Sequence, residues 1–140
     1  MVSEQLFILI SFLLAWALSV IIKTIISSIK RKEKINIKLG FENGGMPSSH
    51  SAAVSSLTSA IFLSQGFSTL FIVSAVFSLI VISDAFKLRR NVGLQCESLN
   101  NLLSKNKMKQ IKVVHGHTFV QVIGGILLGT LTSTIIFFII

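Results

Sequence analysis

Long stretches of this 140-residue chain carry no formal charge. There is no Lys, Arg, Asp or Glu in residues 5–22, 43–83 or 113–140, and Lys23 alone interrupts the apolar run between residues 5 and 29. A helix needs about 20 predominantly apolar residues to cross a hydrocarbon core of about 30 Å. The charge distribution therefore predicts an integral membrane protein that crosses the bilayer more than once.

The composition excludes several soluble classes of protein. Hydrophobic residues make up 51% of the chain and charged residues 13%, whereas about a quarter of a soluble domain is charged. A disordered chain needs low hydrophobicity, so the composition excludes intrinsic disorder. The chain also has too few polar residues for a soluble nucleic-acid binder. Cys96 is the only cysteine, which excludes an intramolecular disulfide and a thiolate metal cluster.

The uncharged stretches predict an all-α polytopic bundle of four transmembrane helices, in a single integral membrane domain over residues 1–140. One span is expected within residues 5–29 and another within residues 119–140. Residues 51–86 are long enough for a helical hairpin, with its turn at residues 64–68, although each limb is short for a span. Between the spans, apolar residues at 92, 96, 99 and 103 share one helical face. They predict an amphipathic helix at the cytoplasmic membrane face; a cytoplasmic helix packed on the bundle is the alternative.

The basic residues are concentrated in two segments. Twelve of the thirteen Lys and Arg lie in residues 30–42 and 87–112, and the net charge is +8. Four spans place both segments on one side, which the positive-inside rule assigns to the cytoplasm of a bacterial plasma membrane or an organellar membrane. The first apolar run does not resemble a cleaved signal peptide, because no basic residue precedes it and no small-residue cleavage site follows it.

Residues 44–51 form a polar cluster at the expected cytoplasmic start of the second span. Gly44 and Gly45 permit positive φ angles, and Ser48 or Ser49 can cap a helix that begins near Pro47. The free N–H groups and the positive dipole end of such a helix suit a phosphate. His50 then lies in the first helical turn. A capped helix start with a histidine at the headgroup level is the other interpretation.

Further ionisable residues are expected at the same membrane face. Asp84 is the only acid in an expected span and is therefore a functional candidate, although it can simply pair with Lys87. Arg89 and Arg90 suit phosphate oxygens, or serve only as topology signals. Lys23 can snorkel to the interface or reach a bound phosphate.

A third cluster, residues 115–118, precedes the last span. His115 and His117 flank Gly116, and histidine serves as base, acid or nucleophile near neutral pH. A metal site is disfavoured, because Asp84 is the only nearby carboxylate and no two histidines lie four residues apart. Gly125 and Gly129 form a small-residue pattern typical of close helix packing.

Together these residues resemble the divergent branch of the type-2 phosphatidic acid phosphatase superfamily, which is related to acid phosphatases and vanadium haloperoxidases. The resemblance is carried by the block from Gly44 to Ala52, by Asp84-Ala85 with Arg89-Arg90, and by Gly116-His117-Thr118. It implies a lipid-phosphate phosphatase that needs no metal or other cofactor. His117 resembles the phosphorylated nucleophile and His50 the general acid. The residues expected to bind phosphate are Lys23, Gly44, Gly45, Ser48, Ser49, Arg89 and Arg90.

The chain also departs from the superfamily pattern. No Arg-Pro follows Lys23, no Ser-Arg precedes His117, and Gln121 stands where an Asp follows the nucleophile by four residues. Asp84 is therefore expected to orient His117 from a neighbouring helix, and Arg89 or Arg90 to replace the missing phosphate-binding Arg.

The expected partners are membrane lipids and a lipid-phosphate substrate, either a polyprenyl phosphate or diphosphate or a phosphatidate-like lipid, and not nucleic acid. A non-catalytic binder or translocator of lipid phosphate, and a small structural membrane subunit, are the alternatives. The role of His115, and whether like chains form a homo-oligomer, stay open at this level.

The predicted orientation can be tested at Cys96. A membrane-impermeant maleimide should label Cys96 in inverted membrane vesicles and not in sealed right-side-out vesicles, because the second basic segment is expected in the cytoplasm. Labelling of Cys96 in the right-side-out vesicles alone would contradict this orientation.

Overall fold

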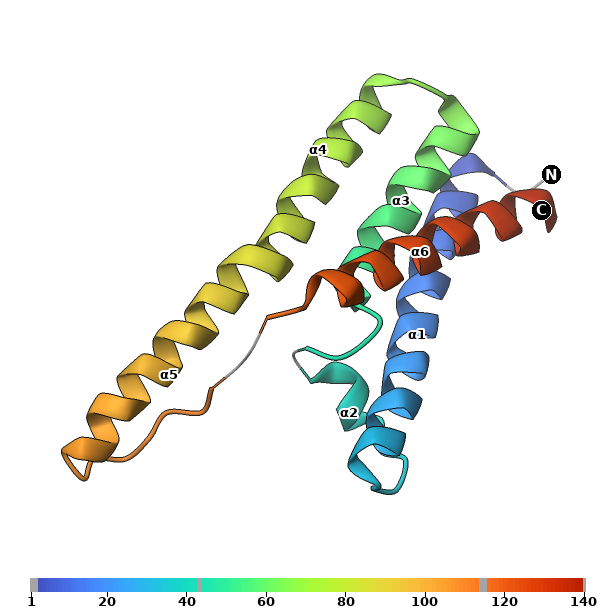
Figure 1. The fold of residues 1–140 in the computed structure, drawn as a ribbon. Helices are drawn as coiled ribbons and strands as arrows, with labels where there is room; N and C mark the ends of the chain where they lie inside the picture. Colours follow the sequence, from blue (N-terminus) through green and yellow to red (C-terminus); the bar gives the residue numbers. More distant parts are fainter. Residues whose placement is uncertain (1–2, 43, 114–115, 140) are drawn as a thin grey trace.

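The computed structural model describes residues 3–42, 44–113 and 116–139, and this part of the chain is helical, with no strand. Figure 1 shows how the helices are arranged. In chain order they are α1 (Glu4–Arg31), α2 (Lys38–Phe41), α3 (Ser49–Gln65), α4 (Thr69–Ser83), the π-helical turn η1 (Asp84–Leu88), α5 (Arg89–Lys105) and α6 (Phe119–Ile139).

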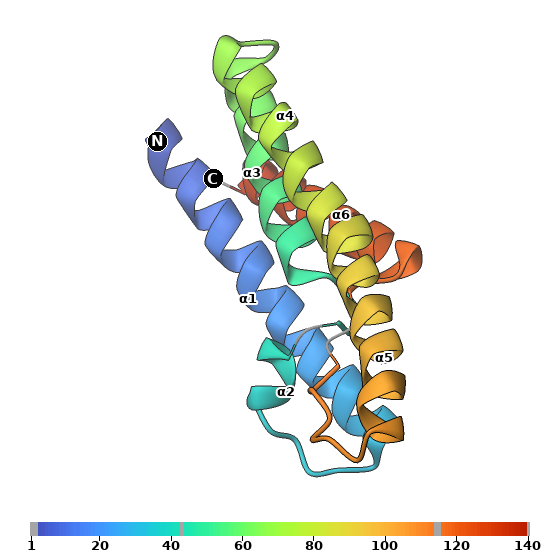
Figure 2. The same ribbon diagram turned by 90° about the vertical axis from the view of Figure 1, so that its left-hand side faces the viewer.

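Helix α3 is the centre of the bundle. It packs against α1, α4 and α6, and Figure 2 shows it between α1 and α4. The same view shows the α1–α2 and α5–α6 connections at one end of the molecule, with the α3–α4 turn at the other. The two basic segments thus lie at the same end of the fold.

Three helices are long and apolar enough to cross a membrane. They are α1, the continuous helix over Thr69–Lys105, and α6. Their outward faces expose large apolar side chains such as Leu9, Ile72 and Leu127, which are each more than half exposed. Exposed apolar helices whose backbone hydrogen bonds are satisfied internally are suited to a lipid environment. The protein is therefore an all-helical integral membrane protein.

The helical hairpin predicted within residues 51–86, with its turn at residues 64–68, is confirmed. Gly66 ends α3 with a φ of 64° and donates its N–H to Phe62 O at 2.8 Å. Ser68 then caps α4, because its hydroxyl accepts the Phe71 N–H at 3.1 Å. A glycine at positive φ followed by a serine N-cap reverses the chain within a few residues.

The helix expected over residues 92–103 lies within α5, but it does not form a separate surface element. Helix α4 continues through η1 into α5, and Figure 1 shows the three as one long rod. The reason is local: Ser83, Asp84 and Arg89 all keep right-handed helical angles, and no Pro interrupts residues 69–105. The π-helical turn widens the helix there without ending it.

The contact between α3 and α6 depends on glycine. A Cβ atom on Gly129 would lie 2.2 Å from Ala52 O, and one on Gly125 would lie 2.4 Å from Ser48 O. Both distances are too short for real atoms, so the backbones approach closely only because these positions lack side chains. The close-packing role predicted for Gly125 and Gly129 is confirmed.

Buried serines connect the remaining helices. Ser56 donates its hydroxyl to Ser11 O at 2.9 Å, from α3 to α1. Ser78 donates to Val54 O at 3.1 Å, from α4 to α3. Small residues and interhelical hydroxyl bonds are the usual means of helix association where the hydrophobic effect is weak.

Substitution of a packing glycine by alanine should destabilise the fold most where the new methyl group would clash with rigid backbone atoms. Gly129→Ala should lower the free energy of unfolding in mixed detergent micelles by about 1–3 kcal/mol, because the methyl group meets rigid backbone. The matched control is Gly124→Ala, whose Cβ would lie 3.0 Å from the flexible Met46 methyl group. An equal effect of the two substitutions would contradict the proposed packing.

Candidate active site

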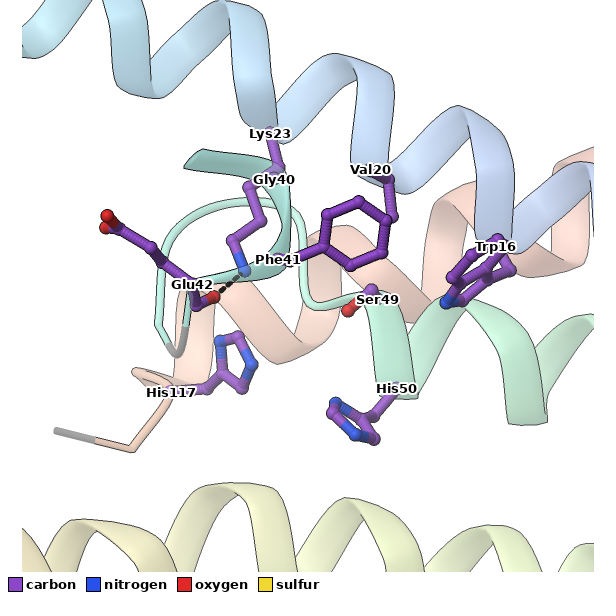
Figure 3. Close-up of a pocket in the computed structure, with 9 residues that line it drawn as sticks. All are labelled: Trp16, Val20, Lys23, Gly40, Phe41, Glu42, Ser49, His50 and His117. Atoms are coloured by element: carbon purple, nitrogen blue, oxygen red, sulfur yellow. Dashed lines mark hydrogen bonds between the residues drawn. The ribbon is translucent and has the colours of Figure 1, made fainter. Parts of the chain in front are cut away.

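A pocket of about 220 Å³ brings together residues from four segments of the chain. Figure 3 shows the residues that line it, drawn from α1, from α2 and the residue after it, from the first turn of α3, and from the loop before α6. They are Trp16, Val20, Lys23, Gly40, Phe41, Glu42, Ser49, His50 and His117. Four of these, Lys23, Ser49, His50 and His117, are among the residues predicted from the sequence.

The backbone of His117 is held by the π-helical turn. In a regular α-helix the Arg89 N–H would donate to Ala85 O, but here it donates to Asp84 O. Ala85 O accepts the His117 N–H instead, at 3.1 Å. Gly116 permits this close approach, since a Cβ atom there would lie 2.5 Å from the backbone nitrogen of Arg90. Single π-helical turns are frequent at functional sites, and this one positions His117.

The His117 ring is buried and oriented by Gln121. The side chain is 4% exposed, and its Nδ1 lies 3.2 Å from Gln121 Oε1. That oxygen also accepts the Thr118 N–H at 3.0 Å, which identifies it as the acceptor facing the ring. Nδ1 therefore carries the proton in the neutral ring, and Nε2 keeps its lone pair.

Burial lowers the pKa of His117, and the charges of Lys23 and His50 act in the same direction. The contacts with Gln121 and with the Gly45 backbone favour the protonated ring and so act against this shift, but they do not overcome it. The neutral imidazole is thus favoured near pH 7, which is the form that can act as a nucleophile.

Lys23 turns into the pocket. Lys23 is 3% exposed, and its ammonium group donates to the Glu42 backbone carbonyl, as Figure 3 shows. Gly45, at a φ of 84°, packs against it so closely that a Cβ atom would lie 2.9 Å from Lys23 Cε. The Glu42 carboxylate meanwhile pairs with Arg31, with Nη1–Oε1 at 3.2 Å. In the described part of the chain, Lys23 has no salt bridge to a carboxylate, so an anion in the pocket would satisfy it.

Residues 44–51 have the predicted helix-start geometry, but only some of them line the pocket. Gly44 and Gly45 have φ angles of 81° and 84°, and Ser48 is the N-cap of α3. Ser48 is fully buried, and its hydroxyl accepts from the Ser51 hydroxyl at 2.9 Å, so it lies behind the pocket wall. Ser49 lines the pocket, whereas Gly44, Gly45 and Ser48 do not. Figure 3 shows the His50 ring directed toward the space in front of His117.

Asp84 does not orient His117, contrary to the expectation from the sequence. Its Oδ2 pairs with Arg89 Nε at 3.1 Å, so Arg89 takes the place expected for Lys87 as the alternative partner of Asp84. The contact to Nδ1 of His117 belongs to Gln121, because a side chain four residues along the same segment reaches back to the ring.

The two arginines stand outside the pocket wall. Arg89 is close enough for its charge to act on His50, but its guanidinium is engaged by Asp84. Arg90 is exposed, and its backbone nitrogen lies beside Gly116. His115 lies outside the described residues.

Several residues of the site were not identified from the sequence. Trp16 and Val20 precede Lys23 by seven and three residues, so helical periodicity alone could have placed them on the same face of α1. The aromatic contact between Trp16 and Phe41, with ring centroids 6.0 Å apart, could not be foreseen, because it depends on how α2 folds back over the pocket.

The lowered pKa of His117 should make stability depend on pH. The folded state binds a proton less readily than the unfolded chain, so this contribution is present above about pH 6.5 and is lost as the pH falls. The melting temperature in detergent should therefore fall more steeply between pH 7.5 and 5.5 for the wild type than for His117→Asn. Parallel profiles for the two proteins would contradict the burial of a neutral ring.

Comparison with known proteins gives a consistent family assignment. No solved structure matches this chain significantly. The chain is 35% identical to the uncharacterized membrane protein YuiD of Bacillus subtilis (strain 168), over 93% of this chain and 93% of that protein. A family model described as the Divergent PAP2 family matches residues 4–132. This chain therefore belongs to the Divergent PAP2 family.

Proposed function

We propose that this protein is a lipid-phosphate phosphatase that works without a metal, through a phosphohistidine intermediate. The observation that carries the proposal is that His117, His50 and Lys23 line one pocket. Transfer of a phosphoryl group requires a nucleophile, an acid for the leaving oxygen and positive charge for the phosphate oxygens. These three side chains supply one group of each kind.

The reaction divides into two displacements. In the first, Nε2 of His117 attacks phosphorus, the bond from phosphorus to the lipid oxygen breaks, and His50 gives that oxygen a proton. In the second, His50 takes a proton from a water molecule that attacks phosphorus, and the bond from phosphorus to nitrogen breaks. Inorganic phosphate leaves, and His117 returns to its neutral form. Lys23 and the N–H groups at the start of α3 neutralise the phosphate oxygens in both steps.

Gln121 has a positioning role in this mechanism. Its Oε1 accepts from Nδ1 of His117, so the opposite nitrogen is the one that attacks. A neutral amide stabilises the imidazolium less than a carboxylate does, so we expect a slower enzyme than a carboxylate in this position would give.

We further propose that α3 is a fourth span, with the basic segments in the cytoplasm. Helix α3 has 17 residues, or about 25 Å, which is short for a hydrocarbon core and requires local thinning of the bilayer. Four spans place both basic segments on one face, which agrees with their position at one end of the fold (Figure 2). The site then lies near the cytoplasmic interface, where a lipid presents its phosphate while its chain stays in the bilayer.

A second candidate is a protein that binds or translocates lipid phosphate without hydrolysing it. Two observations favour this alternative: Gln121 stands in the orienting position, and Arg89 is occupied by Asp84 outside the pocket. A protein that only binds lipid phosphate needs the buried Lys23 cation but does not need His117 as a nucleophile.

Phosphate release from purified protein separates the two functions. The wild type in detergent should release phosphate from at least one of prenyl phosphate, prenyl diphosphate and phosphatidate. His117→Ala and His50→Ala should each lower the rate at least about 100-fold. Asn91→Ala, an exposed position near the basic residues, serves as the control and should retain the wild-type rate.

The outcomes distinguish the two functions. Trapping of labelled phosphate on His117 would support the phosphohistidine pathway. Tight binding of lipid phosphate with no release would favour the non-catalytic alternative. Release that survives His117→Ala would contradict the nucleophile assignment.

A further inference from the structure

A second cavity, lined mostly by apolar side chains, shares part of its wall with the pocket that contains Lys23 and His117. Its volume is about 340 Å³, and it shares three residues with the pocket, namely Trp16, Ser49 and His50. The other lining residues are Phe12, Ala53, Val54, Phe77 and Val81. We refer to this cavity as the α1–α3–α4 groove.

The groove leaves the pocket at the end away from His117. Figure 3 shows Trp16 on the far side of the pocket from His117, and the groove contains Trp16 but neither His117 nor Lys23. Its floor is the buried pair Ala53 and Val54 on α3, and its walls come from α1 and α4. Figure 2 shows the same order, with α3 between α1 and α4.

Pocket and groove follow one face of α1. Phe12, Trp16, Val20 and Lys23 succeed one another at spacings of four, four and three, which is a single helical stripe. From Lys23 to Phe12 the stripe covers about 16 Å, because each residue rises about 1.5 Å. The polar end lies toward the basic segments, and the apolar end lies toward the middle of the apolar helix.

We propose that the α1–α3–α4 groove binds the hydrocarbon chain of a lipid whose phosphate is joined directly to that chain, as in an alkyl or prenyl phosphate. This inference rests on the proposed function, since it takes the pocket with Lys23 as the phosphate site. The chemical class of the lipid follows from the residues that lie between the pocket and the groove. Ser49 and His50 belong to both, so the apolar groove adjoins the pocket directly, with no polar chamber between them among the described residues.

A glycerophospholipid fits this arrangement less well. Its glycerol and two ester groups lie between the phosphate and the chains, and polar groups buried without hydrogen-bond partners are costly. Among the described residues that line the groove, only Ser49, His50 and the indole N–H of Trp16 offer polar groups, and the other side chains, such as Phe77 and Val81, are apolar. A directly attached chain leaves no polar group in the groove.

The test uses photocrosslinking, which does not depend on turnover. The full-length protein in nanodiscs is exposed to dodecyl phosphate that carries a diazirine midway along its chain. Labelling should map to the peptides with Phe12–Trp16 or Phe77–Val81, and it should be competed by dodecyl phosphate but not by dodecanol. Equal competition by dodecanol would overturn the inference, because any bulk lipid chain would then occupy the groove.

Two matched variants on α4 test the groove itself. Val81 lines the groove, whereas Val76 is 52% exposed on the same helix and lines neither cavity. Val81→Phe should lower groove labelling at least about tenfold, and Val76→Phe should leave both labelling and phosphate release as in the wild type. An equal effect of the two variants, or labelling that survives Val81→Phe, would overturn the proposed site.

Phosphate release measured on the same samples separates this inference from the proposed function. Groove labelling without release supports the groove and overturns hydrolysis. Release without groove labelling supports hydrolysis and overturns the groove. Where release occurs, kcat/KM for dodecyl phosphate should exceed that for dilauroyl phosphatidate at least about tenfold, and the reverse order would overturn the assigned lipid class. Absence of both binding and release overturns both proposals.

Discussion

The close contact between α3 and α6 determines where everything else in the site can lie. At Gly125 and Gly129 the two backbones approach more closely than any side chain would permit. Because α3 begins two residues after Pro47 and α6 begins two residues after His117, this one contact brings the two histidine-bearing segments together. The Ser48 N–H donates to Gln121 O at 3.0 Å across the same interface. The residue that caps α3 is therefore tied to the residue that orients the His117 ring.

Burial of charge is the second constraint on the site. A lysine within an apolar helix is costly unless it has partners, and Lys23 has only a backbone carbonyl as its hydrogen-bond acceptor in the described part of the chain. Arg31 takes the Glu42 carboxylate, which leaves the Lys23 charge without an ion pair in that same part. The same burial that makes Lys23 receptive to an anion keeps the nearby His117 neutral. Burial away from water thus favours both anion binding at Lys23 and the neutral form of His117.

Much of the framework could be predicted from local sequence. The α3–α4 turn follows from Gly66 and Ser68, and the start of α3 follows from Ser48, because capping and left-handed turns depend on a few adjacent residues. Lys23, Ser49, His50 and His117 were all recognised as site candidates, and they line one pocket. The partner of Asp84 was not predicted correctly. Whether it reaches His117, Lys87 or Arg89 depends on how the helix winds at η1, and the extra residue in that turn has no clear sequence signature.

Composition and residue order alone are enough to predict a helical membrane protein with its cations in two segments and its histidines next to helix starts. Those properties follow from composition and from the order of polar and apolar residues, which act locally. Three features could be seen only in the folded chain: which polar residues share a pocket, that Gln121 and not Asp84 contacts the His117 ring, and that an apolar groove lies beside His50. The shared pocket depends on the close packing of α3 and α6 at small residues, whereas the groove depends on how α1 and α4 lie against α3, and the Gln121 contact depends on how the chain bends between His117 and α6.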